Sequence, residues 1–154
     1  DTAGKVPAIR HAFVTSEERT GKRFELLVDL DATSPLRTPE DIIACVNLQK
    51  QYDCASVITG APAHRSPYFN WVELNANGIA ALSKPSDIKR RQDSPECYDM
   101  NASIYVWKRE ALLNDPKVFY PDTRLHAMPR ERSQDIDDAL DFDIVELIMK
   151  RNSI

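Results

Sequence analysis

The sequence predicts an α/β fold, in which helices cover a sheet and an antiparallel excursion interrupts the middle of the chain. Residues 24–30 and 54–59 are apolar runs of strand length, and the segment between them has the pattern of a helix. Such a strand–helix–strand succession is the unit of a parallel, helix-covered sheet. Residues 69–74 and 79–82 predict the excursion, because they flank the hairpin turn sequence Asn-Ala-Asn-Gly.

The first half of the chain supplies two helices. Apolar side chains recur at helical spacing over residues 5–18, and Gly21 follows as a stop signal. The next helix is expected over residues 38–51, with a threonine at its cap and a proline in its first turn. Between the two helices, the run over 24–30 is apolar almost throughout, which predicts a strand that is buried on both faces.

Four further elements follow the excursion. We expect a strand over residues 102–107, a short helix over 110–113, an extended and irregular segment over 118–128, and a final helix over 137–151. A chain of 154 residues buries enough surface for one core, so these elements are expected to form one domain over residues 1–154.

Composition and charge exclude several classes of protein. The formal net charge is −4, which is not the positive field of a nucleic-acid-binding domain. No apolar run is long enough to cross a membrane. The three cysteines form no Cys-x-x-Cys pair, which predicts a reduced, cytoplasmic protein without disulfides or a zinc knuckle. We therefore expect neither nucleic acid nor a membrane as a partner.

Two pairs of carboxylates are candidates for a metal site. Asp29 and Asp31 are two residues apart on a strand, so their side chains point to the same face. Asp31 also lies at the carboxyl end of that strand, where open α/β sheets bind ligands. Asp135 and Asp137 come just before the last helix. Carboxylates that converge from two elements suit Mg²⁺, which completes its shell with water and phosphate oxygens.

Simpler interpretations remain open for several polar residues. Asp138 and Asp141 are favoured at a helix N-terminus by the helix dipole, so they need not touch a ligand. The basic run over 89–91 is either a solvated surface stretch or an anion-binding turn. Asn101, at the start of an apolar strand, is either a turn former or a side chain directed at a ligand.

Three segments resemble those of one enzyme family. They read ATSPLRTPEDI, RRQDSPECYDMNASIY and MPRERSQDIDDALDF. In this order, and over essentially the whole chain, they resemble the cytidylyltransferases that activate sialic-acid-type sugars, namely the CMP-N-acetylneuraminate synthetases (acylneuraminate cytidylyltransferases) and their legionaminate and pseudaminate relatives. The chain departs from the usual pattern at Asp31-Ala32, where most members have Gln-Pro, and at Ala102-Ser103, where they have Gly-Ala.

The resemblance implies a fold and a reaction. The fold is a Rossmann-like nucleotidyltransferase sheet whose antiparallel excursion, within about residues 62–128, forms a homodimer. The reaction joins CTP to a nonulosonic acid, giving a CMP-sugar and pyrophosphate, with Mg²⁺ as cofactor. The family's domain opens with a strand and a glycine-containing loop around the triphosphate. The four glycines of this chain lie far apart and form no such loop, so we expect this N-terminal section to be absent from it.

The resemblance also implies roles for particular residues. Asp135 and Asp137 would hold Mg²⁺ against the phosphates and help to deprotonate the attacking hydroxyl. Arg91 and Gln92 would contact the sugar.

Two further sugar contacts follow from the resemblance. Asn101 would reach the sugar from the start of its strand, and Phe119 would close the sugar site of the partner subunit. Asp31, where other members have an amide, is our own candidate for an additional metal ligand. Two alternatives remain: a non-catalytic module for sugar-nucleotide binding or dimerisation, and a cytidylyltransferase for 3-deoxy-manno-octulosonate.

Overall fold

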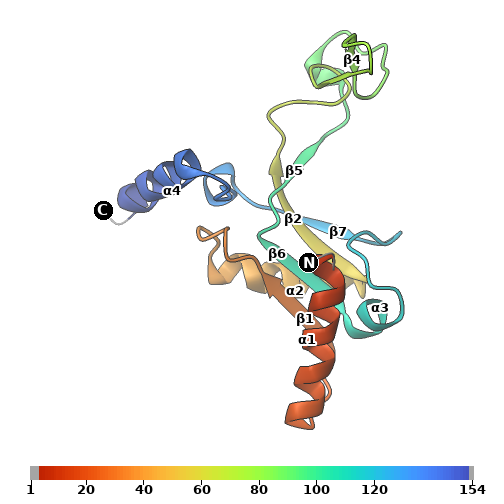
Figure 1. Cartoon of the computed structure of the whole chain (residues 1–154), viewed down its shortest axis with the longest axis vertical. Helices are drawn as coiled ribbons and strands as arrows, with labels where there is room; N and C mark the ends of the chain where they lie inside the picture. The colour runs from red at the N-terminus through yellow and green to blue at the C-terminus, as the bar shows by residue number, and fades with distance from the viewer. Residues whose placement is uncertain (1–3, 153–154) are drawn as a thin grey trace.

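A computed structural model describes residues 4–152, apart from the side chains of Arg91 and Asn152 (Figure 1). Two short 3₁₀ turns accompany the regular elements, at Arg91–Asp93 and Arg130–Arg132. The helices and strands are α1 (Lys5–Thr20), β1 (Leu26–Leu30), α2 (Pro39–Tyr52), β2 (Ser56–Pro62), β3 (Val72–Leu74), β4 (Ala80–Leu82), β5 (Tyr98–Met100), β6 (Ile104–Lys108), α3 (Arg109–Asn114), β7 (Arg124–Ala127) and α4 (Ala139–Asn152).

The central sheet is mixed rather than parallel. β6 lies between β1 and β2 and is antiparallel to both, whereas β7 pairs with the other side of β2 in parallel. β5 continues the antiparallel pairing along the second half of β2. β1 and β2, which the sequence predicts as strands of one parallel sheet, do run in the same direction, but β6 separates them, and among the described strands only β2 and β7 pair directly in parallel. An apolar run identifies a strand but not the strand that pairs with it. Here β1 and β2, which are joined through α2, are not neighbours in the sheet.

The core lies on both faces of this sheet. Against one face, α2 contributes Cys45 to a cluster with Val57, Ile104 and Val106. Against the other face, α1 and α3 form a second cluster. Its buried members are Phe13, Ile58, Tyr105, Trp107 and Leu112. Side chains alternate along β6, so Tyr105 packs in this second cluster, on the face opposite to Ile104 and Val106.

Three strands differ from their predictions. β1 pairs only with β6 among the described residues, and its Val28 is 37% exposed, so the predicted burial on both faces is wrong. β5 and β7 were not predicted, because each has only three or four residues and no apolar run. The excursion is confirmed as a hairpin, in which β3 and β4 project away from the central sheet (Figure 1).

Candidate functional site

A pocket of about 300 Å³ opens at the end of β2, and residues of two of the three motif segments line it. The third segment approaches through Ser34, which contacts both Asn101 and Asp135. Residues 99–102 and 130–137 supply most of its walls. Its lining residues are Ala61, Asp99, Met100, Asn101, Ala102, Arg130, Ser133, Gln134, Asp135 and Asp137. The structure therefore brings together three of the predicted site residues, Asn101, Asp135 and Asp137.

The carboxylate of Asp135 is held by the segment after β1. The Ser34 hydroxyl donates a hydrogen bond to Oδ1 of Asp135 over 3.3 Å, and the Ile136 amide donates to the same oxygen over 3.1 Å. The Ile136 amide also lies 3.0 Å from the carbonyl oxygen of Thr33. The ATSPLR motif thus fixes the loop that carries the aspartates, although the two are about a hundred residues apart in sequence.

The residues before α4 divide into a capping group and a pocket group. Asp138 Oδ1 accepts from the amides of Leu140 and Asp141, and Asp141 Oδ2 accepts from the amides of Asp137 and Asp138. The simpler interpretation of Asp138 and Asp141 as helix caps is therefore confirmed. Asp137 differs, because only its backbone joins this network while the residue lines the pocket.

Asp31 faces α1 rather than this pocket. Its Oδ2 lies 2.6 Å from Nζ of Lys5, and Asp29 lies 3.2 Å from the same nitrogen, which confirms that the two aspartates share a face. The hydrogen bond from Lys5 lowers the pKa of Asp31, and Thr33 donates to its other oxygen. The metal role of Asp31 stays a prediction, and it would require this ion pair to open.

The donor chemistry of the pocket fits Mg²⁺. In the described part of the chain, no group of three or more His, Cys, Asp or Glu side chains is arranged to hold a metal ion. Protein Mg²⁺ sites commonly use only one or two carboxylates, with substrate phosphates and water as the other ligands. Asp135 and Asp137, in one pocket beside open volume, meet that requirement.

The remaining predicted site residues lie elsewhere. Gln92 is exposed and lines a neighbouring pocket of about 340 Å³, and the side chain of Arg91 lies outside the described part of the structure. Phe119 is 60% exposed in the loop between α3 and β7. The preceding residue, Val118, bonds to Ser56 at the start of β2, whereas the aspartate pocket adjoins the end of that strand. Within one chain, Phe119 is therefore not part of the pocket.

Two arginines near the pocket have roles that sequence reasoning missed. Arg130 lines the pocket and also an adjoining hollow of about 390 Å³ that contains Trp71. Arg132 makes a bidentate ion pair with the buried carboxylate of Asp41, with nitrogen–oxygen distances of 2.7 and 2.9 Å. No sequence pattern could show which of the two arginines in MPRER pairs with a carboxylate inside the chain.

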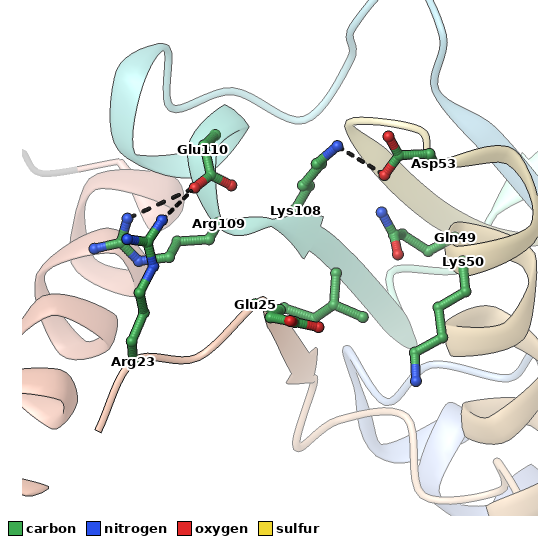
Figure 2. Close-up of a pocket in the computed structure, with 9 residues that line it drawn as sticks. Arg23, Glu25, Gln49, Lys50, Asp53, Lys108, Arg109 and Glu110 are labelled. Atoms are coloured by element: carbon green, nitrogen blue, oxygen red, sulfur yellow. Dashed lines mark hydrogen bonds and ion pairs between the residues drawn. The ribbon is translucent and has the colours of Figure 1, made fainter.

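A larger cavity of about 530 Å³ lies between β6 and the C-terminal end of α2 (Figure 2). Its charges are mostly neutralised in pairs: Arg23 lies 2.9 Å from Glu110, and Lys108 lies 2.7 Å from Asp53. None of the predicted site residues lines this cavity. Volume alone therefore does not identify the functional site, and the smaller pocket with the clustered motifs is the better candidate.

The central sheet with its flanking helices is consistent with a Rossmann-like α/β fold, and the pocket lies at the end of one of its strands. The chain is 43% identical over all 154 residues to the post-translational flagellin modification protein B of Campylobacter coli. It is 42% identical over the same length to the CMP-N,N'-diacetyllegionaminic acid synthase of Campylobacter jejuni. Over 114 residues, 73% of the chain and 27% of the relative, it is 28% identical to an N-acylneuraminate cytidylyltransferase of Streptococcus agalactiae.

These comparisons confirm the resemblance that the three motif segments predicted. The chain spans 65% of the length of each of the two Campylobacter relatives. No protein-family model matches it. Among the described residues, no helix has the length and apolar character needed to cross a membrane.

Proposed function

We propose that the protein transfers the CMP group of CTP to a nonulosonic acid, with release of pyrophosphate. The observation that carries this proposal is the pocket at the end of β2, where Ser34, Asn101 and Asp135 bring the three motif segments together. The similarity to a CMP-N,N'-diacetyllegionaminic acid synthase supports a sugar acid of the legionaminic type as the acceptor.

In the proposed reaction, the anomeric hydroxyl oxygen of the acid forms a bond to the α-phosphorus of CTP. The bond from that phosphorus to the pyrophosphate oxygen breaks, and the hydroxyl proton passes to a carboxylate. Asp135 and Asp137 would hold Mg²⁺, and one of them would accept this proton. Bound Mg²⁺ would neutralise charge on the phosphate oxygens, which is the main demand of phosphoryl transfer. Ser34 would keep the Asp135 carboxylate in place for this task.

Other contacts in the proposal come from the resemblance. Arg91 and Gln92 would bind the sugar acid, and Gln92 lies in a pocket that shares Arg65 with the hollow beside Arg130. Phe119 would act on the site of a partner subunit, and its exposure supports a role outside its own chain.

We also propose a homodimer formed through the excursion. The hairpin and its flanks expose a group of large apolar side chains, which a monomer in water would leave unfavourably hydrated. They are Phe69, Trp71, Val72, Leu74 and Ile79.

The carboxylate role is tested by Asp135→Asn in the full-length protein, with pyrophosphate release from CTP and nonulosonic acid as the measurement. We expect kcat to fall by about 100-fold or more, because the amide neither binds Mg²⁺ well nor accepts the proton. Asp143→Asn is the matched control, since Asp143 lies exposed on α4 outside the pocket. Full turnover of Asp135→Asn at saturating Mg²⁺ would remove the proposed role.

The two alternatives predict different outcomes in the same assay. A non-catalytic module would bind the sugar nucleotide, while the wild-type protein released no pyrophosphate. A 3-deoxy-manno-octulosonate enzyme would turn over that acid in preference to nonulosonic acids. The similarity to a synthase of the legionaminic type favours the nonulosonic substrate.

A further inference from the structure

We propose that Asn101 is a positioning residue for the proposed reaction, which holds the aspartate-bearing loop in place and does not itself bind the sugar. This inference rests on the proposed function and assigns to Asn101 a role different from the sugar contact that the resemblance implies.

The amide of Asn101 has almost no capacity left for a ligand. A carboxamide accepts two hydrogen bonds at its oxygen and donates two from its nitrogen. Oδ1 of Asn101 accepts from the Thr59 hydroxyl over 2.7 Å and from the Ser103 amide over 3.2 Å. Nδ2 donates to Ser133 Oγ over 2.9 Å and lies 3.4 Å from the sulfur of Met128. With 7% of its surface exposed, the residue has both ends of its amide engaged inside the chain.

These bonds lead to Asp135 along two routes. Ser133, the partner of the Asn101 side chain, comes two residues before Asp135 and donates in turn to the carbonyl of Pro129 over 2.9 Å. Ser34 Oγ lies 3.3 Å from the carbonyl oxygen of Asn101 and 3.3 Å from Oδ1 of Asp135, so its single hydroxyl proton is shared between these two acceptors. The side chain of Asn101 therefore holds the aspartate loop through Ser133, and its backbone carbonyl contacts Ser34, which supports the Asp135 carboxylate.

The backbone explains why Asn101 can do this. β6 and β5 form one antiparallel partner of β2 that is interrupted between them, and Ala102 has a left-handed φ of 52° at the break. Such bulges redirect a side chain and are common beside active sites. At this break, the Thr59 hydroxyl replaces a backbone partner for β6, because it accepts a hydrogen bond from the Ile104 amide over 3.0 Å. Asn101 is thus aimed from the sheet toward the 133–137 loop.

The kinetic test compares Asn101→Ala, Ser133→Ala and the double variant in the full-length protein. If Asn101 acts through Ser133, both single variants lower kcat by about 10- to 100-fold, as is typical for outer residues that orient metal ligands. The KM for the nonulosonic acid should change less than about twofold, and the double variant should be no worse than Asn101→Ala, because the two residues share one path. The proposal would be overturned if Asn101→Ala raised the KM for the nonulosonic acid strongly while Ser133→Ala left both kcat and KM unchanged.

A second measurement does not depend on activity. The Ile136 amide is bonded to Thr33, so its hydrogen exchange reports how firmly the loop is held. We expect faster exchange over residues 133–137 in Ser133→Ala, which loses one hydroxyl and should retain the fold. Unchanged exchange in both variants would refute the holding role even in an active enzyme. If the wild-type protein releases no pyrophosphate but exchange becomes faster in the variants, the proposed function is refuted and the holding role of Asn101 is not.

Discussion

At Gly60, β2 passes close to the backbone of β5. A Cβ atom at this position would lie 2.8 Å from the backbone oxygen of Asp99, a distance that real side chains do not adopt. We predict that Gly60→Ala lowers the free energy of unfolding by about 1–3 kcal/mol, because the backbone of β5 must shift. Urea denaturation measures this change. Gly4→Ala is the control, since its Cβ would meet only Pro7 at 3.8 Å, and an equal loss in both variants would contradict the prediction.

Residue placement was predictable where it depends on one element. The two-residue spacing of Asp29 and Asp31 predicts a shared face, and both contact Lys5. The identity of that partner was not predictable, because a strand pattern does not say which helix lies over it. Asn101 is a similar case: its position at a strand start was evident, but its bond to Ser133 depends on a tertiary contact between distant segments.

At the scale of elements, α2 and the 130–132 turn are joined by the ion pair between Asp41 and Arg132. Burial alone raises the pKa of Asp41, but the hydrogen bonds from Arg132 and the Thr38 amide outweigh it and lower this pKa to about 2, against 3.8 for an unperturbed aspartate. A depressed carboxyl pKa stabilises the fold above the unfolded value, and this stability is lost as pH falls toward 2. The contribution is roughly 2 kcal/mol.

We therefore predict that Arg132→Gln destabilises the protein at pH 6 and that its deficit relative to wild type shrinks between pH 5 and 2. Urea unfolding at several pH values measures both. His126, with Nε2 3.7 Å from Asp41, is the other basic group near the carboxylate. A deficit that does not vary with pH would contradict the role of the ion pair.

Helix bounds were more predictable than strand partners, for a physical reason. Helix ends depend on local chemistry: α1 ends before Gly21, whose φ is 64°, and α2 begins after the predicted cap Thr38. Strand neighbours depend on contacts between distant segments. The antiparallel position of β6 and the short strand β7 therefore became evident only in the folded chain.

At the scale of the whole molecule, the excursion is the feature that a dimer would bury. We predict that the full-length protein sediments as a dimer and that Leu74→Glu, at a position that is 69% exposed on β3, shifts it to the monomer. Ile43→Glu is the matched control, because Ile43 on α2 is 58% exposed but lies outside the excursion. A wild-type monomer, or a Leu74→Glu dimer, would refute this interface.

Transfer of CMP to a nonulosonic acid can be tested by identifying the product of the reaction. The full-length protein would be incubated with Mg²⁺, CTP and a panel of nonulosonic acids that includes N,N'-diacetyllegionaminic acid, and the mixture would be analysed by mass spectrometry. We predict a CMP-sugar whose phosphorus comes from the α-position of CTP, with one pyrophosphate per product. CTP that remains intact with every acid tested would contradict it.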